Sequence, residues 1–155
     1  MKSAVVLKRS ILCILTALMI AFIFINSALD ADTSSKESMG VLQFINNIFS
    51  TLNINLTLSE NFVRKCAHFV EYFVLGTLLF FTARAFADLQ IRKLFVPLCV
   101  GFLTACVDET IQLFSFGRSG QFTDVLLDFF GVCTAVFIFY IFTKYSKRKD
   151  KEVLN

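Results

Sequence analysis

The chain has 155 residues, which suggests a single domain, and 56% of them are hydrophobic, with a mean hydropathy of +0.70. So apolar a composition excludes an ordinary soluble globular protein of this size. The net charge of +3 comes from basic residues that flank apolar runs and form no recognition motif, so nucleic acid is not an expected partner. The five cysteines lie inside apolar runs without CxxC spacing, which predicts free, buried thiols.

The first apolar run follows Lys2, Lys8 and Arg9 and predicts a membrane span over about residues 10–28. A basic start followed by an apolar run is also typical of a cleaved signal peptide. The residues after this run, 26–33, offer only a poor small-x-small cleavage site. An uncleaved first span is therefore the favoured interpretation.

The connection between the first and second spans is polar. Residues 30–40 are rich in Asp, Ser and Lys and predict an exposed loop. Residues 41–58 mix Leu, Ile and Phe with Asn, Gln and Ser, and are too polar to span. They predict a short helix, or two, lying along the membrane interface. Ser59 is the predicted cap of the helix that follows.

Three further apolar segments predict spans over about residues 62–86, 94–114 and 124–143, and a basic tail follows at residues 144–155. Residues 115–123 form a tight loop with two glycines around Arg118. The predicted fold is thus all-α: a polytopic membrane protein with a four-transmembrane-helix bundle and a short interfacial helical segment between spans one and two.

The lysines and arginines are distributed unevenly between the two sides of the predicted spans. If the N-terminus is cytoplasmic, four spans place 11 of the 15 basic residues on the cytoplasmic side. The outer side keeps Lys36, Arg64, Lys65 and Arg118. Because cytoplasmic loops carry the excess of Lys and Arg, we predict that both termini are cytoplasmic.

Three of the predicted spans carry ionisable residues at one depth. At ~1.5 Å per residue, His68, Glu71, Asp108 and Asp128 fall roughly 5–12 Å below the outer boundary. Ionisable side chains are costly inside a membrane and usually mark a function. Small residues continue the same helix faces, which indicates that these polar groups face the bundle interior. The pattern predicts a small polar pocket that opens outward.

Two pieces of this sequence, RKCAHFVEYFVLG at 64–76 and DETIQLFSFGRSGQFTDVLLDFFG at 108–131, resemble the VanZ-like family of membrane proteins. The shared motifs are Lys-x-x-His-x-x-Glu-Tyr, Asp-Glu-x-x-Gln, Gly-Arg and Asp-x-x-x-(Asn or Asp)-x-x-Gly. The chain departs from many members at Phe116, where they have Pro, and at Asp128, where they have Asn. The resemblance implies a bacterial plasma-membrane protein, and the family is named after a protein associated with teicoplanin resistance.

With the motif residues added, the predicted outer pocket comprises Lys65, His68, Glu71, Tyr72, Asp108, Glu109, Gln112, Arg118, Asp124 and Asp128. Three uses of this pocket stay open. The first is structural: the polar groups satisfy one another, with Arg118 paired to Asp108 or Asp124. The second is binding of a lipid-linked cell-wall precursor or a glycopeptide, with the basic groups holding a phosphate.

The third use is catalysis. His68, Glu71, Asp108 and Asp128 are candidate ligands for a divalent metal, which would assist hydrolysis, and His68 is alternatively a general base. The chain has no HExxH, GxSxG or P-loop motif. Membrane lipid is the expected partner. We expect a protein of the outer membrane face that acts in glycopeptide tolerance or envelope modulation; the alternative is an intramembrane, metal-assisted enzyme acting on a lipid or cell-wall precursor.

Overall fold

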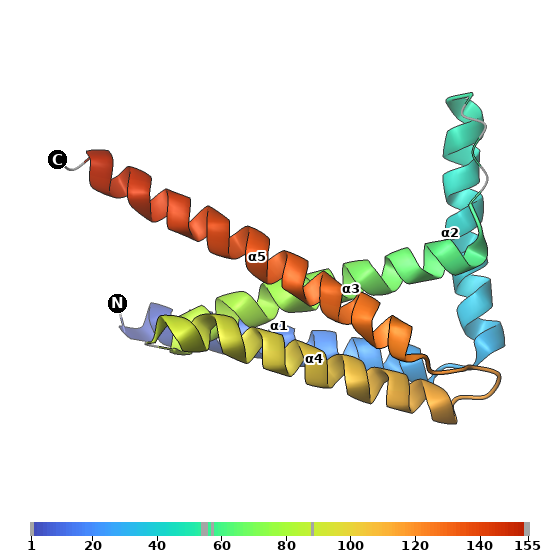
Figure 1. Ribbon diagram of the computed structural model, residues 1–155, viewed down its shortest axis with the longest axis horizontal. Helices are drawn as coiled ribbons and strands as arrows, with labels where there is room; N and C mark the ends of the chain where they lie inside the picture. Colours follow the sequence, from blue (N-terminus) through green and yellow to red (C-terminus); the bar gives the residue numbers. More distant parts are fainter. Residues whose placement is uncertain (1, 54–55, 57, 88, 154–155) are drawn as a thin grey trace.

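The computed structural model describes residues 2–53, 56, 58–87 and 89–153, with the backbone alone described for residues 37 and 147–153. In this part of the chain all regular secondary structure is α-helical, and short connections join the helices (Figure 1). The described helices are α1 (Lys2–Ala28), α2 (Ala31–Thr51), α3 (Glu60–Phe86), α4 (Gln90–Phe114) and α5 (Phe122–Val153). Among them α1, α3, α4 and the Phe122–Ser146 part of α5 are long and apolar enough to cross a membrane. The predicted four-span helical bundle is thereby confirmed.

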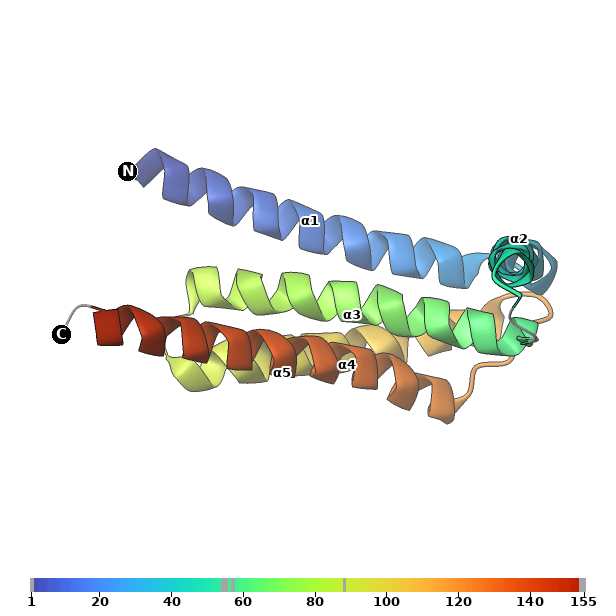
Figure 2. The ribbon, with the colours of Figure 1, turned by 90° about the horizontal axis from the view of Figure 1, so that it is seen from above.

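Helices α1, α3, α4 and α5 run along the length of the molecule, whereas α2 lies across one end of them (Figures 1 and 2). The start of α1 and the end of α5 both lie at the opposite end, apart from each other (Figure 2). We call these two ends the α2 end and the terminal end. A helix that crosses the end of a spanning bundle has the orientation expected of an interfacial segment, which agrees with the predicted helix between spans one and two.

The predicted loop over residues 30–40 is wrong, because α2 already begins at Ala31. Asp30 caps this helix: its Oδ1 accepts a hydrogen bond of 2.8 Å from the backbone N–H of Thr33. Asp32 adds a favourable negative charge in the first turn. The predicted cap at Ser59 is confirmed by the hydrogen bond of 3.2 Å that its Oγ accepts from Phe62 N–H. Of the predicted interfacial segment, residues 54, 55 and 57 lie outside the described part.

The membrane helices extend beyond the spans expected from hydropathy. Helix α1 begins at Lys2, α4 at Gln90, and α5 continues to Val153 through the basic tail. Lys and Arg are good helix formers, so charge ends the apolar run without ending the helix. The five cysteines are free as predicted, but Cys13 and Cys66 lie on the exposed surface of their helices rather than in the core.

Small residues bring α3, α4 and α5 into close contact. A β-carbon at Gly76 of α3 would lie 2.9 Å from the Cα of Val132 on α5, and one at Gly101 of α4 would lie 2.6 Å from a methyl carbon of the same valine. Ala105 and Ala135 are fully buried beside this crossing. The predicted inward faces of α4 and α5 are therefore confirmed, and the polar residues on those faces point into the bundle.

Candidate functional site

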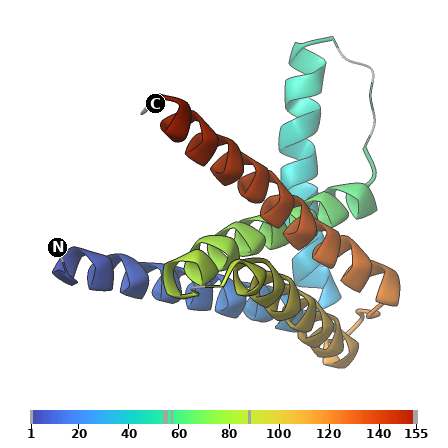
Figure 3. The ribbon, with the colours of Figure 1, turned by 60° about the vertical axis from the view of Figure 1, so that its left-hand side comes forward.

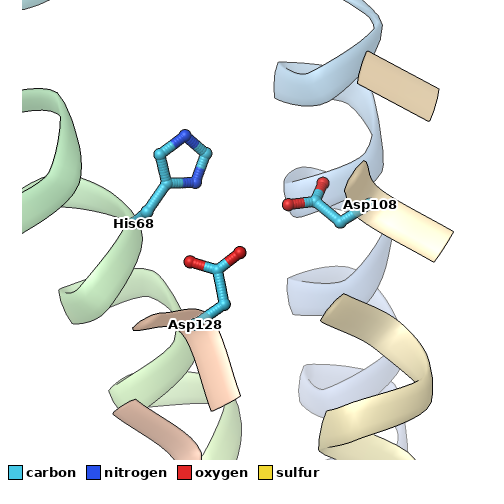
Figure 4. A group of neighbouring side chains, drawn as sticks. All are labelled: His68, Asp108 and Asp128. Carbon is cyan, nitrogen blue, oxygen red and sulfur yellow. The ribbon is translucent and has the colours of Figure 1, made fainter. Parts of the chain in front are cut away.

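Three ionisable side chains from three helices meet inside the bundle. His68 of α3, Asp108 of α4 and Asp128 of α5 each offer one ligand atom, and these atoms all lie within 4.8 Å of one another (Figure 4). Asp108 and Asp128 are 0% and 1% exposed. We call these three residues the His–Asp–Asp group. The group lies in the half of the bundle that is nearer to the α2 end. This is the depth at which the sequence predicts ionisable residues on all three helices.

The two aspartates of this group have different surroundings. Asp108 accepts hydrogen bonds from Ser27 Oγ, at the end of α1, and from Gln112 Nε2 at 3.5 Å. Neither carboxylate oxygen of Asp128 has a hydrogen-bond partner among the described residues, and the same holds for His68 Nδ1. An unpaired buried charge costs several kcal/mol. The Asp128 carboxyl is therefore stable only in its protonated form or beside a cation.

Glu71 and Tyr72 flank the His–Asp–Asp group without joining it. Glu71 Oε1 lies 3.4 Å from Asn26 Nδ2, and its Oε2 lies 3.9 Å from His68 Nδ1, which is too long for a hydrogen bond. Tyr72 is fully buried, and its hydroxyl lies close to Asp108 without reaching good hydrogen-bond geometry. Of the four candidate metal ligands, the structure thus brings three together and leaves Glu71 beside them.

Arg118 has different partners from those expected. Its Nη1 donates to the carbonyl oxygens of Asn26 and Ser27, each at 3.1 Å, and its Nη2 donates to Ser34 Oγ at 3.0 Å. The last carbonyls of a helix lack intrahelical partners, so Arg118 satisfies the end of α1 and joins it to α2. Burial, followed by the nearby Arg64, lowers the pKa of Arg118 from its ordinary value. A guanidinium nevertheless keeps its charge in a protein.

The expected pairing of Arg118 with Asp108 or Asp124 is absent among the described ion pairs. Asp124 instead pairs with Lys65, whose Nζ lies 2.7 Å from its Oδ1. Glu109 holds the loop after α4, because its Oε2 accepts a hydrogen bond of 2.9 Å from Gln121 N–H. Gly117 has a φ of +73°, a conformation that favours glycine and lets the chain turn beside Arg118. These contacts fix the loop that covers the site.

A cavity of about 130 Å³ reaches His68 and Asp128 of the His–Asp–Asp group, whereas Asp108 does not line it. Arg64, Lys65 and Arg118 contribute positive charge to its lining, whereas Asp124 and Asp128 contribute acidic groups. The remaining lining residues are His68, Gln112, Gly117, Ser119, Gln121 and Leu127. We call it the polar pocket. Its mixture of charges allows it to hold a cation at the acids and an anion at the bases.

A second cavity of about 370 Å³ lies between α1, α2 and α3 and shares Arg64 and His68 with the polar pocket. Glu71 faces this cavity rather than the first. Sequence reasoning missed Asn26 and Ser27, which bring the end of α1 into the site. Their signal was weak, since an uncharged polar pair at the end of an apolar run usually marks only the end of a span.

Comparisons with known proteins place the chain in one family. The model of the VanZ/LLP1 family matches residues 12–143, which includes every residue of the predicted pocket. Comparisons with curated proteins and with solved structures gave no match. The match extends well beyond the two motif-bearing pieces and covers most of all four membrane-crossing helices. The chain therefore belongs to the VanZ/LLP1 family.

Proposed function

We propose that the protein acts at the outer face of the bacterial plasma membrane, where the polar pocket binds the anionic headgroup of an envelope lipid. One observation carries this proposal. The Asp128 carboxylate is buried without a partner in a cavity that Arg64, Lys65 and Arg118 also line. Occupation or shielding of that headgroup would modulate the cell envelope and raise tolerance of the glycopeptide teicoplanin.

The outward direction of the pocket is supported by the basic residues. Lys36, Arg64, Lys65 and Arg118 belong to the α2 end. The other basic residues belong to the terminal end, where α1 and α4 begin and α3 and α5 end. Since an excess of Lys and Arg marks the cytoplasmic side, this distribution favours cytoplasmic termini and an outward-facing α2 end.

The size of the pocket favours a small anionic group over a whole antibiotic. A volume of about 130 Å³ has room for only a few water molecules, or for a group such as a phosphate. The phosphates of a lipid-linked cell-wall precursor lie at the membrane surface, at the level of Arg64 and Lys65. The lipid tail would stay in the bilayer, outside the pocket, so the pocket needs to enclose only the charged group.

The acids of the pocket require a cation if a phosphate is to enter. Asp128, with Asp108 beside it, would repel an anion, whereas a divalent ion between these acids and the phosphate would attract both. Carboxylate oxygens and an imidazole nitrogen form a common ligand set for divalent metals. We therefore infer that the His–Asp–Asp group holds a divalent cation, and that this cation and the basic residues bind the headgroup together.

Binding of a prenyl diphosphate to the purified protein in detergent tests this proposal. We expect saturable binding in the presence of Mn²⁺ or Mg²⁺, and at least about tenfold weaker binding with a chelator or in His68→Ala. Loss of a residue that only supports a metal ligand already costs about 10–100-fold in affinity, so loss of a ligand should cost no less. The matched control is Lys36→Gln, which removes a basic residue of the α2 end that does not line the pocket. Equal binding with and without the chelator would contradict the inference.

A second candidate, an intramembrane metal-assisted enzyme, is favoured by the number of ligands. Three protein ligands leave positions open on a metal, which is typical of catalytic rather than structural sites. Water would add across a phosphoanhydride bond of the bound precursor and yield two phosphate products. Release of inorganic phosphate from the prenyl diphosphate in the assay above would favour this candidate, and binding without turnover would favour the first.

A further inference from the structure

A surface groove lies between helices α4 and α5, and none of its lining residues lines the polar pocket. It has a volume of about 570 Å³ and is lined almost entirely by apolar atoms. Leu94 and Leu98 of α4 form one side, and Val136, Phe137 and Tyr140 of α5 form the other. Both walls belong to membrane-crossing helices, so the groove lies within the apolar layer.

The groove follows from the way in which the helices cross. Gly101 packs against Val132, which brings α4 and α5 close together in the middle of the bundle. From that contact toward the terminal end the two helices diverge (Figures 1 and 3). The side chains between them are too far apart to fill the space, so a groove remains on the surface.

A basic cavity continues the groove at the terminal end. Its volume is about 420 Å³, and it shares Leu94 and Tyr140 with the groove. Arg84 and Lys144 line it, and none of its described lining residues is acidic. Arg84 donates one hydrogen bond to Thr143 Oγ1 at 3.3 Å, and its guanidinium lies 5.4 Å from the centre of the Phe80 ring. Arginine has five N–H donors, so this arrangement leaves donors for an anion.

We propose that the groove and the basic cavity form one binding site for an anionic phospholipid. The phosphate would lie between Arg84 and Lys144, and one acyl chain would lie between α4 and α5. The charge of the cavity favours this occupant. A zwitterionic lipid adds a positive group beside two positive residues, and a second copy of the chain would have to bury both charges. The proposal does not depend on the function of the polar pocket.

A single tryptophan can report on the lipid in the groove, because the chain contains no tryptophan. Phe137→Trp places one in the groove wall, at a side chain that is 65% exposed. Phe95→Trp is the matched control, because Phe95 is 63% exposed and does not line the groove. Like Phe137, it lies between the Gly101–Val132 contact and the terminal end, at a similar number of residues from that contact. The full-length variants are reconstituted in vesicles that contain brominated phosphatidylglycerol or brominated phosphatidylcholine.

We expect brominated phosphatidylglycerol to quench the tryptophan at position 137 with a relative association constant at least about fivefold higher than that of phosphatidylcholine, since each of the two basic residues near an anionic lipid contributes up to roughly that factor. At position 95 the ratio should be lower than at position 137, and the preference that remains there should depend on the neighbouring Arg92 and Lys93 rather than on Arg84 and Lys144. Arg84→Gln with Lys144→Gln should abolish the preference at position 137, whereas Arg92→Gln with Lys93→Gln, which removes two charges of the same end outside the cavity, should preserve it.

Three results would overturn the proposal. The first is the same preference at positions 137 and 95, which would indicate a general attraction of anionic lipid to the basic end. The second is a preference that survives the loss of Arg84 and Lys144. The third is weak quenching by both lipids at position 137 together with strong quenching at position 95, which would show that a second copy of the chain covers the groove.

Discussion

At the scale of single residues, the site combines one satisfied acid with one unsatisfied acid. Asp108 has hydrogen bonds to Ser27 and Gln112, whereas the oxygens of Asp128 have none among the described residues. Both side chains are fully or almost fully buried. A structural network would satisfy its members. The contrast therefore supports the proposal that Asp108 stabilises the fold and that Asp128 takes part in binding.

This contrast predicts opposite effects for two identical substitutions. With a chelator present, Asp128→Asn should keep or raise the thermal stability of the protein in detergent, because it removes an unpaired acid at no cost in contacts. Asp108→Asn should lower the free energy of unfolding by about 1–3 kcal/mol, because it disturbs a satisfied buried group. Equal losses of stability in both variants would support the purely structural interpretation of the pocket.

Arg118 is one of the residues that tie α1 and α2 to the loop after α4, since it donates to Asn26, Ser27 and Ser34. Arg118→Lys should loosen this junction, because an ammonium cannot reach all three acceptors in the geometry of a guanidinium fork. We expect amide hydrogen exchange of residues 26–34 to rise on the order of tenfold, consistent with a lost charged hydrogen bond. Arg64→Gln is the control, since Arg64 bonds to Asn61 on its own helix. The same increase in both variants would contradict this role.

At the scale of helices, glycines set the distances that bring the His–Asp–Asp group together. Gly131 of α5 comes so close to α3 that a β-carbon there would lie 2.7 Å from the carbonyl oxygen of Phe69. Gly76 makes a similar contact with Val132 on the other side of Tyr72. Because Phe69 adjoins His68, and Gly131 follows Asp128 by less than one turn, these contacts also fix the relative positions of His68 and Asp128.

Leucine at Gly76 should therefore reduce both stability and metal binding. The backbone of Val132 cannot move aside as a flexible side chain can, so we expect a loss of about 1–3 kcal/mol from overpacking and a lower folded yield. Phe142→Leu changes a lipid-facing residue of α5 that is 68% exposed, and it should leave the melting temperature in detergent nearly unchanged. Equal melting temperatures for the two variants would contradict the close crossing.

The convergence of His68, Asp108 and Asp128 could be predicted because helical rise is constant and small residues mark the inward faces. The partners of Arg118 could not, since they depend on where the end of α1 lies in the bundle. The error over residues 30–40 has a different cause. Their polar composition suggested a loop, whereas the cap at Asp30 and the helix-compatible residues after it determine the structure.

At the scale of the whole molecule, the two ends differ in chemistry. The α2 end contains the polar pocket, and the terminal end contains most of the basic residues and the apolar groove beside Arg84 and Lys144. With cytoplasmic termini, the pocket meets components of the outer leaflet and the groove meets anionic lipids of the inner leaflet. One small bundle would then bind two lipids from opposite sides of the membrane.

The orientation can be tested with single cysteines in a cysteine-free background. A cysteine at Ser119, which is exposed at the α2 end, should react with an impermeant thiol reagent in intact cells. One at Ser146, exposed near the terminal end, should react only after permeabilisation. This result follows from the excess of basic residues at the terminal end. The reverse pattern would exclude an outward-facing pocket and, with it, the proposed action at the outer face.

If the orientation holds, the pocket residues should govern tolerance in cells. We expect His68→Ala to lower teicoplanin tolerance while the amount of folded protein stays near that of the unaltered chain, because no hydrogen bond to His68 Nδ1 is lost. Lys36→Gln, at the same end but outside the polar pocket, should keep tolerance. Full tolerance with His68→Ala would separate the pocket from this phenotype.

The central claim is that the His–Asp–Asp group binds a divalent cation. The most direct test is to titrate the chelator-treated protein with Mn²⁺ and to follow binding by electron paramagnetic resonance. We predict one ion per chain, and affinity lowered at least about tenfold in His68→Ala and Asp128→Asn, because loss of a group that merely supports a metal ligand already costs that much. Asp124→Asn should bind nearly as well, since Asp124 lines the same cavity but pairs with Lys65 outside the group. No stoichiometric ion, or an equal loss in Asp124→Asn, would contradict the claim.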